Sequence, residues 1–314
     1  MAAAGRKLHH LVPRFYLRAW ANREEQVYCL QDGRILRPNV KNVCAQNYFY
    51  RLQALSQEDV DFLRTAIIND SPKALKAVHE QLIGAFTRPF ALKQKLLAAD
   101  SASPEAMAQI ERLIVELNED VHTSVEERFR PYLHAMIEGK LDFLKDPPRA
   151  AEFFWGLALQ YMRTDYLKRA RRPIERERLE RYNRIANLLA HIVAFNAGFS
   201  LFLDRGSLTI MLLDNRTAVP FVTGDQPVIN IAANPKSTKP PARFDLFYPL
   251  SPQKAMLLLE PASESLPSQS WVSETAAHVY NLRMAAHSCR QVFATSPRLL
   301  EAVRSDLPAY LSCL

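Results

Sequence analysis

SPEAMAQIERLIVELNEDV, residues 103–121, is the clearest structural signal in this chain. Ser103 followed by Pro104 is typical of a helix start, with serine as the N-cap and proline in the first turn. The apolar residues that follow recur every three or four positions, which predicts a long amphipathic helix. They are Met107, Ile110, Ile114, Leu117 and Val121.

Helical patterns continue on both sides of this stretch, over about residues 56–203. Pro147 and Pro148 separate two helical segments, and Pro173 separates an apolar helix from an arginine-rich one. Residues 185–203 contain no Asp, Glu, Lys or Arg, but polar residues such as Asn187 and His191 interrupt them. We therefore expect a buried core helix there rather than a membrane span.

Both ends of the chain carry β patterns. Asp32-Gly33 lies between short runs at residues 26–30 and 34–38, which predicts a hairpin. Further strands are predicted at 47–51, 208–213, 218–222, 228–231, 246–250, 255–259 and 291–294, with a helix at 273–286. The prediction is an α+β fold: a predominantly helical body with a small, mostly antiparallel sheet built from the N-terminal and C-terminal segments. We expect a single domain, 1–314, with an N-terminal arm and hairpin (1–55), a helical body (56–203) and a β-rich part (204–314).

The composition is ordinary for a globular protein, with 48% hydrophobic and 23% charged residues in 314. Wholesale disorder is thereby excluded. The eight glycines assemble into no phosphate-binding loop motif, and the four cysteines have neither disulfide-scaffold nor zinc-site spacing. The N-terminus has no apolar segment of a secretory signal. We expect a cytoplasmic protein with no membrane partner, and the oligomeric state stays open.

The positive charge is concentrated between residues 163 and 184, where nine Lys or Arg stand against four Asp or Glu. Two interpretations stay open. Either the segment is a solvated helix face with i,i+4 pairs such as Glu177–Arg181 and Glu180–Arg184, or it is a basic ridge that binds nucleic acid or a nucleotide. The substrate-binding candidates on that ridge are Lys168, Arg169, Arg171 and Arg172.

Three short segments could carry chemistry. His9 and His10 precede an extended Val12-Pro13 step, so the two imidazoles could serve as metal ligands or as base and electrophile. They could equally form a hydrogen-bonded structural pair. Arg14 follows them as a candidate for substrate binding.

The second segment is Gln160-x-x-Arg163-Thr164, whose three polar residues share one helix face at i, i+3 and i+4. If this face points inward, an anionic ligand is one partner for it; the alternative is the edge of a solvated basic helix. The third segment is Thr223-Gly224-Asp225-Gln226, a turn that can present a carboxylate at a sheet edge.

A family resemblance rests on motifs that occur in a fixed order. They are His9-His10-x-Val12-Pro13-x-Phe15-Tyr16-Leu17, Tyr48-Phe49-Tyr50, Gln160-x-x-Arg163-Thr164, Phe221-x-Thr223-x-Asp225-x-Pro227-Val228, Pro249-Leu250-Ser251-Pro252 and Asn281. In these the chain resembles the domain-of-unknown-function family numbered 4238, whose members are mostly bacterial. The resemblance implies that the polar residues converge, and it brings no known activity. This chain reads Gly224-Asp225-Gln226 where family members more often have Ser-Asp-Asn.

The leading hypothesis is an intracellular hydrolase acting on a phosphodiester, either a nuclease or a nucleotide hydrolase, in a bacterial toxin or defence setting. A histidine would act as general base or metal ligand, Arg163 would hold the anion, and Gln160 would position substrate or water. Thr164, Thr223 and Gln226 would bind substrate. One divalent metal on His9, His10 and Asp225 is the expected cofactor if metal is used. The alternative is a non-catalytic protein that binds nucleic acid or a partner, with a structural His/Asp/Arg network.

Overall fold

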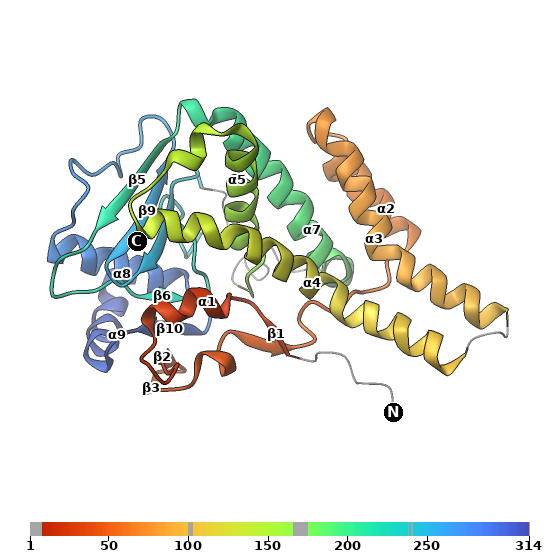
Figure 1. Cartoon of the computed structure of the whole chain (residues 1–314), viewed down its shortest axis with the longest axis horizontal. Coiled ribbons are helices and arrows are strands. Elements are labelled where there is room, and N and C mark those ends of the chain that lie inside the picture. Colours follow the sequence, from red (N-terminus) through yellow and green to blue (C-terminus); the bar gives the residue numbers. More distant parts are fainter. Residues whose placement is uncertain (1–7, 100–102, 166–174, 238, 240, 314) are drawn as a thin grey trace.

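Helices make up most of the structure, a computed structural model that describes residues 8–99, 103–165, 175–237, 239 and 241–313 (Figure 1). The longer helices are α2 (Gln57–Leu63), α3 (Lys73–Ala98), α4 (Pro104–Ile137), α5 (Pro147–Met162), α7 (Arg176–Leu203), α8 (Glu274–His287) and α9 (Pro297–Ser312). Short helical turns are α1 (Arg14–Leu17), η1 (Arg18–Trp20), η2 (Val40–Asn42), η3 (Arg64–Ile68), η4 (Asp142–Lys145) and η5 (Asp204–Gly206).

The strands form three small antiparallel sheets. Their orders are β1-β4, β3-β2-β10-β6 and β5-β9-β8-β7. The strands are β1 (Leu8–His10), β2 (Tyr28–Gln31), β3 (Arg34–Leu36), β4 (Ala45–Asn47), β5 (Thr209–Asp214), β6 (Thr223–Gly224), β7 (Ile229–Asn230), β8 (Leu246–Ser251), β9 (Lys254–Leu259) and β10 (Gln291–Ala294). Because β10 lies between the N-terminal β2 and β6, the predicted α+β fold with sheet segments from both chain ends is confirmed.

The predicted start of α4 is also confirmed. The Ser103 side chain accepts a hydrogen bond from the Ala106 N–H, and Pro104 occupies the first helical position. The hairpin turn is Asp32-Gly33, whose φ angles of 49° and 73° match the twist that a two-residue hairpin requires.

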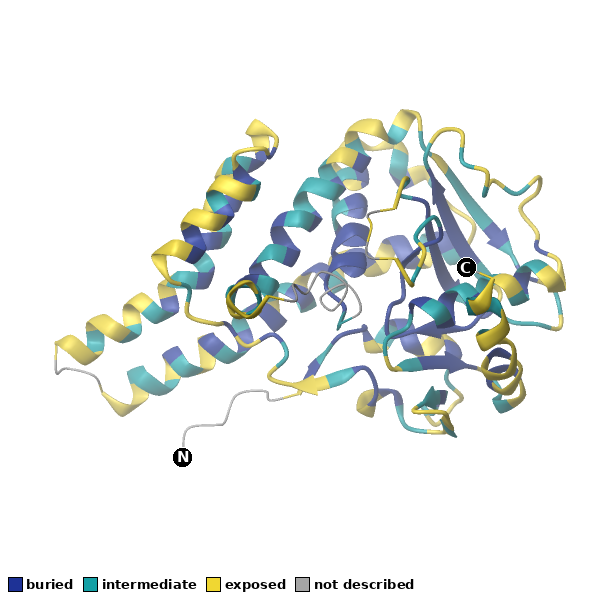
Figure 2. Ribbon diagram, turned by 180° about the vertical axis from the view of Figure 1, so that it is seen from behind, coloured by how far each residue is buried: buried dark blue, intermediate teal, exposed yellow. Residues whose placement is uncertain are grey.

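In the sheet β5-β9-β8-β7, strands β7, β8 and β9 are buried on both faces, whereas the edge strand β5 is partly exposed. Tyr248 and Met256 pack toward α4 and α5, whereas Phe247 and Leu257 pack toward α8 and α9. This two-residue alternation explains why these strands are apolar at nearly every position. A third apolar cluster joins α2, α3, α4 and α7, which extend away from the sheets (Figures 1 and 2).

Two of the predicted strands need correction, and one helix was not predicted. Residues 218–222 do not form a strand, because side chains from elsewhere take the place of strand partners: Asn281 bonds to Val222 N and Pro220 O, and Trp20 donates to Phe221 O. The strand predicted at 47–51 is shorter and lies at Ala45–Asn47. Helix α9 was not predicted, although Ser296-Pro297 repeats the signal at the start of α4.

The apolar helix at 185–203 is the second half of α7 and packs against α5. Among the described residues, the segment 176–206 is the one helix long and apolar enough to cross a membrane by length and composition. Ile185, Leu188 and Ile192 lie in the third apolar cluster. The predicted pairs Glu177–Arg181 and Glu180–Arg184 are not those observed, because Arg181 and Arg184 reach Asp59 of α2 at 3.6 and 2.7 Å.

Candidate functional site

His9 is fully buried in β1. Its ring stacks on Tyr50 with centroids 5.8 Å apart, and its Nδ1 accepts a hydrogen bond from the Tyr50 N–H at 2.8 Å. The contact ties the N-terminal strand to the segment after β4. His10 is only partly buried. Its backbone N–H donates to Glu119 Oε1, and its ring Nε2 lies 3.2 Å from the Lys41 carbonyl oxygen.

Arg163, the residue after α5, is one of the largest fully buried side chains described. Its guanidinium donates to Tyr50 Oη at 3.0 Å, to Glu126 Oε1 at 2.5 Å and to the His10 carbonyl at 2.7 Å. Burial by itself would lower the pKa of Arg163, but Tyr50 and Glu126 outweigh burial and raise it. Arg163 therefore stays charged and joins α5, α4 and β1.

Thr164 and Gln226 contact each other directly, which links the end of α5 to the turn after β6. The Thr164 hydroxyl donates to Gln226 Oε1, and Gln226 Nε2 donates to the Tyr161 and Val228 carbonyls. Thr223 lies 2.7 Å from the hydroxyl of buried Tyr16, through which it contacts the segment after β1.

Asp225 binds backbone rather than side chains. Its carboxylate accepts the N–H groups of Cys289, Arg290 and Gln291 at 2.7, 2.7 and 3.2 Å. Burial raises the pKa of Asp225, and the three backbone bonds oppose that rise. The residue thus fixes the entry into β10.

The remaining predicted residues are placed as follows. Gln160 is buried in α5, and its Oε1 has no hydrogen-bond partner among the residues the structure describes. Lys168, Arg169, Arg171 and Arg172 lie outside the described residues. No group of three or more His, Cys, Asp or Glu side chains in the described part of the chain is arranged to hold a metal ion, so His9, His10 and Asp225 do not form such a group.

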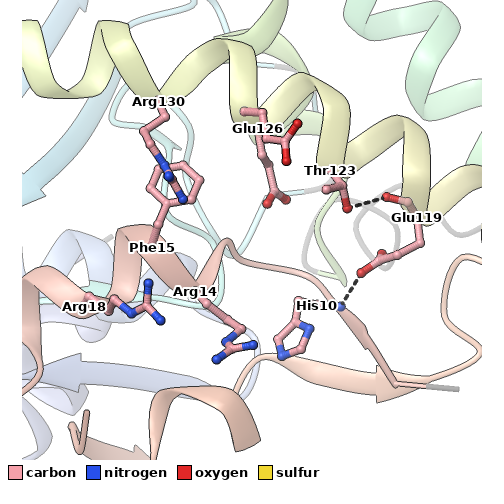
Figure 3. A pocket seen from close by; sticks show the side chains of 9 residues that line it. His10, Arg14, Phe15, Arg18, Glu119, Thr123, Glu126 and Arg130 are labelled. Carbon is pink, nitrogen blue, oxygen red and sulfur yellow. Dashed lines mark hydrogen bonds between the residues drawn. The ribbon is translucent and has the colours of Figure 1, made fainter. Parts of the chain in front are cut away.

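A pocket of about 320 Å³ opens between the N-terminal segment and α4 (Figure 3). Its lining residues are His10, Arg14, Phe15, Arg18, Glu119, Thr123, Glu126, Glu127 and Arg130. We call it the His10 pocket. Of this set, His10 and Arg14 were predicted as site residues, and Phe15 belongs to the family motif.

The α4 residues of the pocket follow a helical spacing. Glu119, Thr123, Glu126 and Arg130 share one face of the helix and point toward α1 and β1 (Figure 3). This polar stripe in an amphipathic helix was the signal available in the sequence. It was concealed because solvent-facing stripes look the same.

Burial sets the electrostatics of the pocket. It lowers the pKa of His10 below its ordinary value of 6.5; the Lys41 hydrogen bond opposes this change, while Arg14 and Arg163 reinforce it. Burial also raises the pKa of Glu126, against the opposing effect of Arg163. At neutral pH the His10 imidazole is therefore neutral. Because the Lys41 carbonyl can only accept, Nε2 carries the proton and Nδ1 is the basic nitrogen.

These features define an α+β protein with a mixed-charge pocket set beside a buried polar network. The chain belongs to the family described as "Protein of unknown function (DUF4238)", whose model matches residues 8–298. No curated protein and no solved structure matches this chain.

Proposed function

We propose that the protein is a hydrolase that acts on a phosphodiester, and that the reaction takes place in the His10 pocket. The observation that carries the proposal is a neutral imidazole, with its pKa lowered by burial, in the same pocket as several arginines. Perturbed pKa values in a cleft are typical of functional sites.

His10 would act as the general base through Nδ1 and take a proton from the attacking water. The water oxygen would bond to phosphorus as the P–O bond to the leaving alkoxide breaks, and the proton would then pass from His10 to that alkoxide. Arg14 and Arg130 would hold the phosphate oxygens. Arg14 makes no ion pair with any described residue, and Arg130 lies over the Phe15 ring at 4.7 Å. Arg18 is paired with Glu25, so we assign it no part in binding.

The charge balance of the pocket is compatible with an anion because Arg163 lies behind it. Three arginines and three glutamates line the pocket. Arg163 bonds to Glu126 at 2.5 Å and compensates that carboxylate from inside the protein. Because Arg18 is paired with Glu25, Arg14 and Arg130 then stand against Glu119 and Glu127, so the lining carries no net negative charge that would repel an anion.

The test is turnover of bis(p-nitrophenyl) phosphate, with labelled RNA, DNA and cyclic nucleotides in parallel. The His10→Ala variant should lose about 10²–10⁴-fold in rate, the usual contribution of a general base. His278→Ala is the matched control, since His278 lies on α8 and pairs with Asp306. Equal rates for His10→Ala and wild type, or no turnover by wild type on any substrate, would refute the proposal.

The alternative is a non-catalytic protein that binds nucleic acid or a partner, in which the motif residues form a structural network. It draws support from the burial of His9 and Arg163, whose hydrogen bonds join separate elements. In that case His10→Ala leaves every measured property of the protein unchanged, whereas His9→Ala lowers its melting temperature.

A further inference from the structure

A second hollow, of about 420 Å³, lies near the β1–β4 ribbon, between the segment after β4 and the first half of α7. We call it the Tyr48 groove. A smaller hollow of about 230 Å³ shares the lining residues Gln46, Asp165 and Arg290 with it, so the two adjoin. None of the residues that line the Tyr48 groove lines the His10 pocket.

Amide side chains are the main polar groups of the Tyr48 groove. Gln46 comes from β4, and Asn183 and Asn187 lie one helical turn apart on α7. Asn187 Nδ2 donates to the Phe49 carbonyl at 3.3 Å, so Gln46 and Asn183 are the amides assigned to a ligand. An amide offers both a donor and an acceptor, the combination that reads the edge of a nucleobase. Such a lining is suited to neutral hydrogen-bonding ligands better than to a bare ion.

Tyr48 provides an aromatic surface at the rim. The residue is 39% exposed, and its backbone has φ = 57°. A tyrosine is costly in this left-handed conformation, where glycine or asparagine is favoured. A strained residue that exposes its ring to solvent points to a role in binding rather than in packing.

Two arginines of the Tyr48 groove can contact phosphates. Arg51 lies over the Tyr48 ring with 5.9 Å between its guanidinium carbon and the ring centroid, and both residues are exposed. Arg51 also lies 3.5 Å from the Glu111 carboxylate, which Lys93 pairs with as well, so the three side chains together keep one positive charge. Arg290 is exposed and lies 3.4 Å from the Asp165 carboxylate, whose charge it compensates. The groove thus combines stacking, hydrogen bonding and positive charge.

We propose that the Tyr48 groove binds single-stranded nucleic acid, with one base stacked on Tyr48, base edges on the amides, and phosphates on Arg51 and Arg290. A duplex is disfavoured because its bases are already stacked and cannot lie on a tyrosine ring. This inference rests on the proposed function for its choice of substrate class. The test of this inference measures binding and does not depend on turnover.

The test is fluorescence anisotropy with fluorescein-labelled RNA and DNA 12-mers, single- and double-stranded, in the His10→Ala background so that cleavage does not interfere. Tyr48→Gly should weaken single-strand binding by about 5- to 150-fold, the equivalent of one base–aromatic stack. It should leave the melting temperature unchanged or raised, because glycine relieves the strained φ. Tyr48→Trp should retain binding.

Trp271→Ala is the matched control, since Trp271 is 56% exposed and lies outside the groove. Arg51→Ala should reduce the salt dependence of binding by about one counterion. The proposal fails if Tyr48→Gly binds as tightly as its parent, if duplexes bind as well as single strands, or if no oligonucleotide binds.

The two proposals can fail separately. Tight single-strand binding that depends on Tyr48, together with no turnover by wild type, would remove the hydrolase proposal and leave the groove. Turnover of small diesters that depends on His10, with no oligonucleotide binding, would support the hydrolase proposal and refute the proposal for the Tyr48 groove.

Discussion

Replacing Arg163 with methionine is expected to destabilise the fold by about 3 kcal/mol. The substitution keeps much of the side-chain volume but removes the donors to Glu126, Tyr50 and the His10 carbonyl. Breaking a buried ion pair on one side typically costs about 3–5 kcal/mol, because the remaining charge is uncompensated. We take the lower end because the Glu126 side chain is 18% exposed. For a chain of this length the loss corresponds to a melting temperature lower by about 5 °C.

The measurement is urea unfolding of Arg163→Met, of Arg163→Met/Glu126→Leu and of an exposed control on α9, Arg298→Met. The double variant should recover at least half of the loss, since no buried charge remains. The control should stay within about 0.5 kcal/mol of wild type. A loss below about 1 kcal/mol, or a double variant no more stable than Arg163→Met, would refute the reasoning.

The pH dependence of Arg163→Met provides a second check. Arg163 lowers the pKa of Glu126, so its removal raises further a pKa that burial already raises. A carboxyl with a raised folded-state pKa contributes stability at low pH and loses it as pH rises through that pKa. The deficit of Arg163→Met relative to wild type should therefore shrink as the pH falls through the raised pKa of Glu126. A constant deficit would contradict the assignment of the cost to Glu126.

Three further predictions concern other parts of the structure. The hydrolysis rate should fall on acidification with a midpoint below pH 6.5, because His10 must be unprotonated and its pKa is lowered; a pH–rate profile measures this, and a midpoint above 6.5 would contradict it. Gly224→Ala should cost about 1–3 kcal/mol in urea unfolding, because its Cβ would collide with the Ser288 hydroxyl, and Gly224→Ala/Ser288→Gly should recover most of that loss. Asp59→Ala should lower the free energy of unfolding by about 2 kcal/mol at neutral pH, because the variant loses the α2 cap and the Arg184 pair. These contacts lower the pKa of Asp59, so the difference in melting temperature between the variant and wild type should disappear as pH falls through that pKa.

The elements that periodicity specifies could be predicted from the sequence. The start of α4 and the hairpin at Asp32-Gly33 are determined by residues that are neighbours in the sequence. Residues 218–222 could not be predicted in the same way, since their hydrogen bonds come from Trp20 and Asn281, far away along the chain. Gly224 shows the same limit: its difference from the family pattern becomes intelligible only beside the Ser288 hydroxyl.

The candidate site was only partly accessible to sequence reasoning. Motif residues do meet: Arg163 bonds to the His10 carbonyl, and Thr164 bonds to Gln226. What the sequence could not provide was burial, which places His9 inside the protein and leaves His10 at a pocket. Adjacent residues of a strand point to opposite sides, so the consecutive histidines His9 and His10 lie in different environments.

The position of β10 has a consequence for synthesis on the ribosome. The N-terminal hairpin can enter its sheet only after β10 has emerged, because Gln31 pairs with Gln291, 260 residues later. Until β10 has been synthesised, β2 pairs only with β3 and its other edge is open. A nascent chain that stops before β10 should be held by chaperones or degraded.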